Sequence, residues 1–185
     1  FSFEDAKKTV LEGLAPMGEE YLSHLKDGFE HGWIDVYENQ GKRSGAYSWG
    51  AYGTHPYVLL NYQGTLNDVF TLAHEMGHAL HSWYSDETQP YIYAGYRIFV
   101  AEVASTCNEA LLIHHLLKKA KDPKTKAYLI NYFLEQFRTT LFRQTMFAEF
   151  EKITHGLQEA GEALTAERLC SIYYDLNKAY FGEDI

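Results

Sequence analysis

The segment TLAHEMGHALH lies in the first half of the chain and contains the pattern H-E-x-x-H, formed by His74, Glu75 and His78. Upstream, Thr65 and Asp68 have the spacing of a capping box, which predicts that a helix begins at this point. Apolar residues then recur at helical spacing, at Leu66, Val69, Phe70, Ala73, Met76, Leu80 and Trp83. The pattern is therefore expected on an amphipathic helix that must bury one face.

Residues four apart on a helix lie one above the other, with Cβ atoms about 5–6 Å apart. The imidazoles of His74 and His78 can therefore converge on one cation. Zinc takes nitrogen ligands at about 2.0–2.1 Å, and its catalytic sites combine three protein ligands with one open position. Glu75 lies one step round the helix, beside the cation, where a carboxylate suits the task of a general base. The pattern predicts a zinc site.

The third protein ligand must come from another segment. His81 follows His74 by seven residues and lies about 10.5 Å farther along the helix axis, so the two cannot share an ion. The candidate is Glu102, because a carboxylate among Phe, Val and Ala residues would be costly to bury unpaired. Ser105 and Glu109 fall on the same side of that second helical run, and either could orient a ligand imidazole. The alternative for both is an ordinary surface side chain.

Four blocks of sequence, in this order, carry a resemblance to a known family: GKRSGAYS (41–48), PYVLLNY (56–62), HEMGHALHS (74–82) and FVAEVAS (99–105). Together they resemble oligoendopeptidase F, in the thimet-oligopeptidase-like (M3) family of zinc metallopeptidases. The resemblance extends over nearly all of the chain, and four ordered blocks are far more specific than the zinc pattern alone.

The resemblance implies a mainly α, zincin-like catalytic domain over 1–185, with a small antiparallel β-sheet, that hydrolyses short oligopeptides rather than folded proteins. It implies Zn²⁺ as cofactor, with His74, His78 and Glu102 as ligands and Glu75 as the base. Family members are much longer, with a helical region before this segment and a Tyr- and His-rich stretch after it that stabilises the transition state. We therefore expect a fragment of a longer enzyme, whose remainder packs against this domain and supplies the oxyanion donor.

Upstream of the H-E-x-x-H helix, short runs rich in Tyr, Trp, Val and Leu are punctuated by glycine. They predict strands near 46–52 and 57–62 that pair as an antiparallel sheet. Glycine in a strand often marks the close approach of another backbone, and a peptide can pair with an exposed strand edge through its main chain. We therefore expect Gly45, Ala46 and Tyr47 to lie along the substrate. The alternative is a plain hairpin.

Further helices are predicted at 19–30, 124–155 and 165–180, and after a capping box that begins at Ser2. The stretch 85–95 between the two metal-bearing helices contains Asp, Pro and Gly and is expected to be a loop. No internal repeat is present.

The composition excludes some partners. A net charge of −9 and a pI near 5.4 argue against nucleic acid, since phosphate binding needs clustered Lys and Arg. Cys107 and Cys170 form no disulfide framework, which favours a reducing compartment, the cytoplasm. No apolar run is long enough to span a bilayer, so no membrane partner is expected.

Two rival functions stay open at this level. One is a zinc hydrolase that acts on another class of substrate, which a panel of short peptides tested against folded protein substrates would separate. The other is a non-catalytic metal-binding helical domain, which metal analysis and the effect of chelation would reveal.

Overall fold

The computed structural model describes residues 1–184, and the chain divides into two compact units, one over 1–121 and one from Asp122 onward. The single catalytic domain expected over 1–185 stays a prediction. In chain order, the elements of the first unit are α1 (Phe3–Gly13), the 3₁₀ turn η1 (Ala15–Met17), α2 (Glu19–Glu30), β1 (Ile34–Asp35), β2 (Tyr47–Trp49), β3 (Tyr57–Leu59), α3 (Leu66–Thr88), α4 (Tyr91–Ala94) and α5 (Ile98–Lys119).

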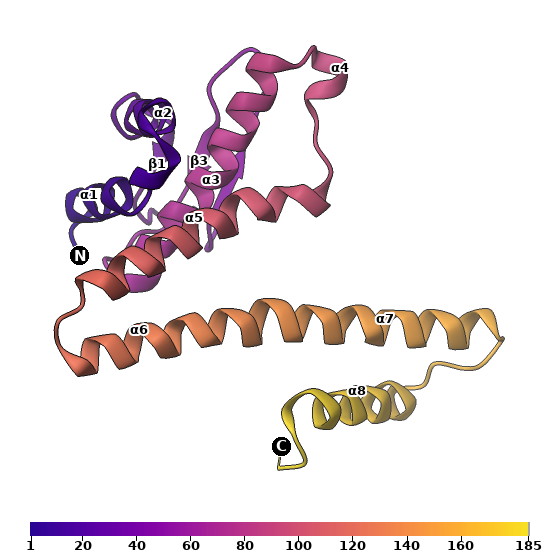
Figure 1. Cartoon of the computed structure of the whole chain (residues 1–185). Coiled ribbons are helices and arrows are strands. Elements are labelled where there is room, and N and C mark those ends of the chain that lie inside the picture. The colour runs from indigo at the N-terminus through magenta and orange to yellow at the C-terminus, as the bar shows by residue number, and fades with distance from the viewer. Residues whose placement is uncertain (185) are drawn as a thin grey trace. The chain divides into compact units, whose positions relative to one another are not determined.

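Helix α3 is the centre of the first unit: α1, α2, α4, α5 and the sheet all pack against it (Figure 1). It begins as the capping box predicts, because the Thr65 side chain accepts from the Asp68 backbone N–H at 3.2 Å. In return, Asp68 Oδ2 accepts from the Thr65 backbone N–H at 2.8 Å. The expected apolar face is buried, with Ala73, Met76 and Leu80 fully covered. The capping box and the buried apolar face thus place the H-E-x-x-H pattern on a helix that is packed against the rest of the first unit.

The sheet has the strand order β1-β3-β2. β2 and β3 pair antiparallel as expected, with Ser48 opposite Val58, whereas β1 pairs parallel to β3, with Ile34 opposite Val58. The antiparallel pairing expected for the strands near 46–52 and 57–62 is therefore confirmed, and β1, which the sequence analysis did not predict, makes the sheet mixed. β1 has only two residues, too few to show an alternating pattern. It lies parallel because the chain crosses to the far edge and forms β2 before it returns to the middle as β3.

The loop expected at 85–95 is largely helical, which corrects that prediction. Helix α3 continues to Thr88, because neither Gly nor Pro occurs between His78 and Gln89. After Pro90 the chain forms the single turn α4, and the Ser85 hydroxyl donates to the Ala94 carbonyl oxygen at 2.5 Å. This hydrogen bond holds the connection against the end of α3.

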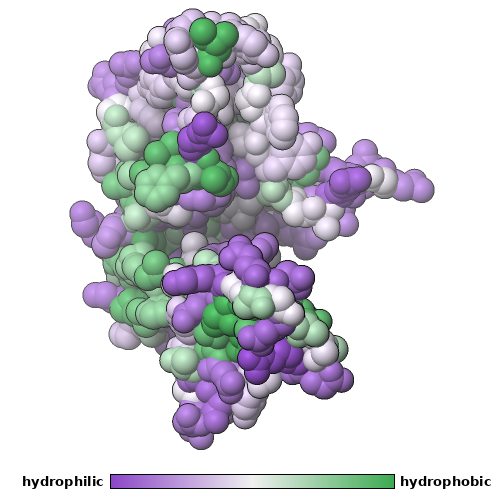
Figure 2. All heavy atoms as spheres, turned by 90° about the vertical axis from the view of Figure 1, so that its right-hand side faces the viewer, coloured by the Kyte–Doolittle hydropathy of each residue, from purple (hydrophilic) through white to green (hydrophobic). Residues whose placement is uncertain are grey.

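The second unit contains α6 (Pro123–Gln136), the π-helical segment η2 (Phe137–Phe142), α7 (Arg143–Glu159) and α8 (Ala166–Phe181). The first three form one continuous helical run, which confirms the long helix expected at 124–155. Asp122 caps this run by accepting from the backbone N–H groups of Lys124 and Thr125. Apolar side chains remain at the surface of both units, and Figure 2 shows them in green on one face. No helix within residues 1–184 combines the length and apolar character needed to cross a membrane.

Candidate metal centre

Helices α3 and α5 bring together the three side chains that the sequence singled out as ligands. The Nε2 atoms of His74 and His78 are 3.1 Å apart, and each lies 3.4 Å from Glu102 Oε2. His81 is not part of this group; its ring stacks on Tyr96 with the ring centroids 3.7 Å apart. The predicted trio therefore converges on one point between the two helices.

The spacing of these three atoms fits a tetrahedral zinc ion. Ligand atoms at about 2.0–2.2 Å from zinc lie about 3.3–3.6 Å from one another in a tetrahedral arrangement. The triangle formed by His74, His78 and Glu102 has sides of 3.1, 3.4 and 3.4 Å. One nitrogen pair is slightly closer than the ideal, and a shift of a few tenths of an ångström in either imidazole would relieve it. The donor set of two imidazoles and one carboxylate is also one that zinc accepts.

Glu109 fixes the orientation of one imidazole. Its Oε1 atom lies 2.5 Å from Nδ1 of His74. Because a carboxylate only accepts, the ring hydrogen belongs on Nδ1, and Nε2 carries the lone pair that faces Glu102 and His78. Such a partner on the far side of a ligand imidazole fixes the tautomer and raises its basicity. Of the two candidates for this task, Glu109 makes the contact.

Ser105 lies on the expected side of α5 but makes a different contact from the one suggested by the sequence. Its hydroxyl lies 2.7 Å from Glu102 Oε2 and 3.1 Å from the Glu102 carbonyl oxygen, and it contacts no imidazole. Ser105 is fully buried, whereas the Glu102 side chain is 55% exposed. A buried donor therefore holds one oxygen of a carboxylate that is itself more than half exposed. The idea that Ser105 orients an imidazole was wrong; it orients the carboxylate.

The charges around the centre shift the pKa values of its members. Burial would lower the pKa of His74, but the hydrogen bond and charge of Glu109 outweigh it and raise that pKa. Burial lowers the pKa of His78 against the opposing charge of Glu102, which favours the neutral form that binds a cation. Glu75 is only 7% exposed, and burial raises the pKa of its carboxyl. A buried carboxylate with a raised pKa is a stronger base than one in water.

Gly77 and Asn108, which the sequence analysis missed, hold α3 and α5 close together. A Cβ atom on Gly77 would lie 2.8 Å from Ser105 Cα and 2.9 Å from the Ala104 carbonyl oxygen, so the two helix backbones touch there. One turn away, the Asn108 amide donates to the Ala73 carbonyl oxygen at 2.9 Å. A glycine inside a helix costs about 1 kcal/mol relative to alanine, so Gly77 within the motif was itself a signal of close packing.

Gly77→Ala is expected to destabilise the protein by about 1–3 kcal/mol, the usual range for overpacking a core, and to weaken metal binding. The added methyl group meets backbone atoms of α5, which cannot rotate away, so α5 must move and carry Glu102 with it. Thermal unfolding and zinc titration would measure the two effects. Gly156→Ala on α7 is the matched control, since nothing lies within 4 Å of its added Cβ atom. An unchanged midpoint for Gly77→Ala would contradict the close contact.

The model of peptidase family M3 matches residues 2–185. Among curated relatives, Oligopeptidase PepF of Bacillus subtilis (strain 168) is 58% identical over 182 residues, which cover 98% of this chain and 27% of that protein. Oligoendopeptidase F, chromosomal, of Lactococcus lactis subsp. cremoris is 52% identical and is covered to 30%. The chain thus spans less than a third of the length of these relatives.

Solved structures are similar in fold as well. The crystal structure of a putative peptidase from Chlamydophila abortus has a TM-score of 0.84 and 46% identity, covering 98% of this chain and 31% of that chain. The crystal structure of oligoendopeptidase-F from Enterococcus faecium has a TM-score of 0.60 and 36% identity, covering 97% of this chain and 24% of that chain. These likenesses confirm the resemblance and the mainly α fold expected from four sequence blocks. Since the family model matches from the second residue to the last, the chain belongs to peptidase family M3.

Proposed function

We propose that this chain carries the catalytic centre of a zinc endopeptidase that hydrolyses short oligopeptides. The observation that supports this most directly is the triangle of His74 Nε2, His78 Nε2 and Glu102 Oε2, whose sides lie within a few tenths of an ångström of those in a tetrahedral zinc site. Glu75 stands one residue from the first ligand and is buried beside it. A metal-binding domain without catalysis has no need of that second carboxylate.

In this proposal His74, His78 and Glu102 hold the ion, and Glu75 moves a proton. Zinc, when bound, acts as a Lewis acid that lowers the pKa of water and polarises a carbonyl group. Glu75 takes the proton from the attacking water and passes it to the leaving amine, so no covalent intermediate is required. Glu109 and Ser105 keep a ligand imidazole and the ligand carboxylate in place during this exchange.

Strand β2 supports the proposal that the substrate lies along Gly45, Ala46 and Tyr47. β2 is an edge strand, paired on one side with β3, and it has no second strand partner within residues 1–184. The Asn61 amide donates to the carbonyl oxygens of Arg43 at 2.9 Å and Gly45 at 2.8 Å, which fixes the approach to this strand. Tyr47 is 51% exposed. A peptide that adds to the free edge is held through its backbone, which places few demands on its sequence.

The remainder of a longer enzyme is proposed to cover apolar surface that this chain exposes. Phe99 on α5 is 87% exposed and Leu134 on α6 is 60% exposed, although such side chains are normally covered. The curated relatives are more than three times as long as the matching segment, so they contain ample chain for this purpose. The donor that stabilises the oxyanion is likewise expected outside this chain, and the cytoplasmic location stays a prediction.

The proposal is tested on the complete natural protein that contains this chain. We expect it to cleave internally quenched peptides of about ten residues and to leave folded protein substrates intact. Removal of metal by a chelator should abolish cleavage, and stoichiometric zinc should restore it. Metal analysis of protein purified without chelating resin should find zinc. Full cleavage after complete metal removal would exclude a zinc peptidase, and an absence of cleavage in zinc-loaded protein would favour the non-catalytic alternative.

A further inference from the structure

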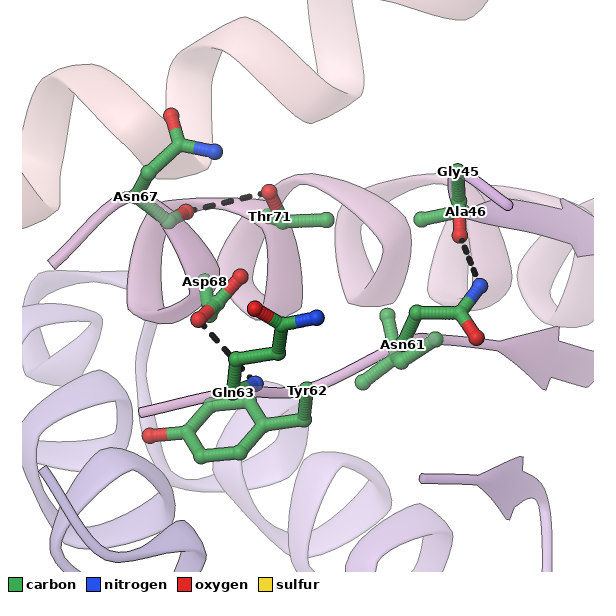
Figure 3. A pocket seen from close by; sticks show the side chains of 9 residues that line it. Gly45, Ala46, Asn61, Tyr62, Gln63, Asn67, Asp68 and Thr71 are labelled. Carbon is green, nitrogen blue, oxygen red and sulfur yellow. Dashed lines mark hydrogen bonds between the residues drawn. The ribbon is translucent and has the colours of Figure 1, made fainter. Parts of the chain in front are cut away.

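A pocket of about 280 Å³ lies between the first turns of α3 and the segment that leads into β2. Gly45 and Ala46 form one wall, Asn61 and Gln63 come from the chain after β3, and Asp68 and Thr71 come from α3 (Figure 3). This volume is close to the lower limit of about 300 Å³ for small-molecule pockets. The pocket can therefore hold one side chain but not a length of peptide.

The pocket lies where a side chain of the proposed substrate would reach it. Thr71 precedes His74 by three residues on α3, so both side chains lie on the same face of the helix. Gly45 and Ala46 belong to the stretch proposed to run along the substrate. The inference drawn here therefore rests on the proposed function and specifies which substrates it would favour.

Three of the polar side chains that line the pocket donate hydrogen bonds within the protein. The Asn61 amide donates to Arg43 and Gly45, as described above. The Thr71 hydroxyl donates to the Asn67 carbonyl oxygen at 3.0 Å, as Figure 3 shows. The Gln63 amide donates to Glu38 Oε2 at 3.4 Å. Asn61 and Thr71 therefore offer a ligand mainly their oxygen atoms, whereas Gln63 offers its oxygen atom and one remaining amide hydrogen.

A carboxylate completes the lining. Asp68 Oδ2 accepts from the backbone N–H groups of Gln63 at 3.2 Å and Thr65 at 2.8 Å, and from the Thr65 hydroxyl at 2.9 Å. Its charge is held in place by these contacts, while its other oxygen adds one more acceptor. No Lys, Arg or His stands among the described residues that line the pocket. The pocket therefore combines a negative charge with an excess of acceptors.

We propose that this acceptor pocket binds the side chain of a basic residue, Lys or Arg, in the peptide substrate. An ammonium or guanidinium group carries several donors and no acceptor, which complements the Asp68, Asn61, Gln63 and Thr71 oxygens. The pocket would then select for a basic residue at one position near the scissile bond. The edge of β2 would bind the rest of the peptide without regard to sequence.

The test measures kcat/KM of the complete protein on matched quenched peptides that carry Lys, Met or Glu at a single position. At one position we expect the Lys peptide to be favoured over the Met peptide by about tenfold, the effect of a charged hydrogen bond. Gln63→Lys should remove or reverse this preference, because it places a cation in the pocket. Gln40→Lys adds the same charge to an exposed residue outside the pocket and should leave the preference unchanged.

Asp68→Asn is the second variant, because it removes the charge and keeps the shape of the side chain. It should reduce the preference for Lys, while Asp5→Asn, at the same position of the α1 cap, should not. The pocket assignment would be overturned if the preference for Lys survived both Gln63→Lys and Asp68→Asn, or if no position showed a preference for Lys. In either case the protein would still cleave the peptides, so the proposed function would stand. Failure to cleave every peptide with zinc bound would instead overturn the proposed function and this inference together.

Discussion

Glu75→Gln is expected to lower kcat of the complete enzyme by about 10²–10⁴-fold, the usual contribution of a general base, and to leave zinc content unchanged. Glutamine has nearly the same shape as glutamate but cannot accept a proton from water. The metal should be retained, because Glu75 lies outside the group formed by His74, His78 and Glu102. Peptide hydrolysis and metal stoichiometry, measured on the same preparation, would give both results.

The control for this variant is Glu87→Gln, which makes the same chemical change at an exposed position on the same helix. It should retain normal kcat and normal zinc content. If Glu75→Gln kept normal turnover, Glu75 could not be the base. If it lost zinc along with activity, Glu75 would belong to the ligand set, and the division between holding the ion and moving a proton would be wrong.

The local part of the candidate centre could be predicted from sequence because short-range signals carry it. The box of Thr65 and Asp68 marks the start of α3, and the four-residue spacing of His74 and His78 places both imidazoles on one face of the helix. Glu102 required more, since nothing in the spacing connects it to His74. It was proposed because a carboxylate among apolar residues was expected to be buried, and the family resemblance pointed to the same residue. The expected burial was wrong, since the Glu102 side chain is 55% exposed and Phe99 beside it is 87% exposed.

The features that sequence did not predict all depend on contacts between distant segments. Ser105 lies on the expected side of α5, but only the structure shows that its hydroxyl contacts Glu102. The close contact at Gly77 and the parallel pairing of β1 likewise arise from the way that helices and strands meet. The glycine was visible as an anomaly, whereas a strand of two residues leaves no periodic pattern to detect.

Glu102→Ala is expected to reduce zinc affinity by more than Glu109→Gln does, and to remove activity at ordinary zinc concentrations. A carboxylate ligand supplies one of three protein bonds to the ion. Glu109 only orients an imidazole, and loss of such a partner typically costs about 10–100-fold in affinity. Competition between the protein and a chelator of known affinity would measure both variants. Because the Glu102 side chain is 55% exposed and alanine favours helices, the fold of the metal-free protein should be retained.

Comparison of the zinc affinities of Glu102→Ala and Glu109→Gln tests whether Glu102 is a ligand. If Glu102 lies at one corner of the zinc site, its removal leaves only two imidazoles, and raising the zinc concentration should refill the site while restoring little turnover. Glu109→Gln keeps all three ligands, so excess zinc should restore most of its activity. Another residue would have to complete the site if the two variants bound zinc with equal affinity. The same would follow if the Glu102→Ala protein were saturated with zinc at a low zinc concentration. Such a result would leave His74 and His78 in place but remove the link between α3 and α5 on which the proposed peptidase centre depends.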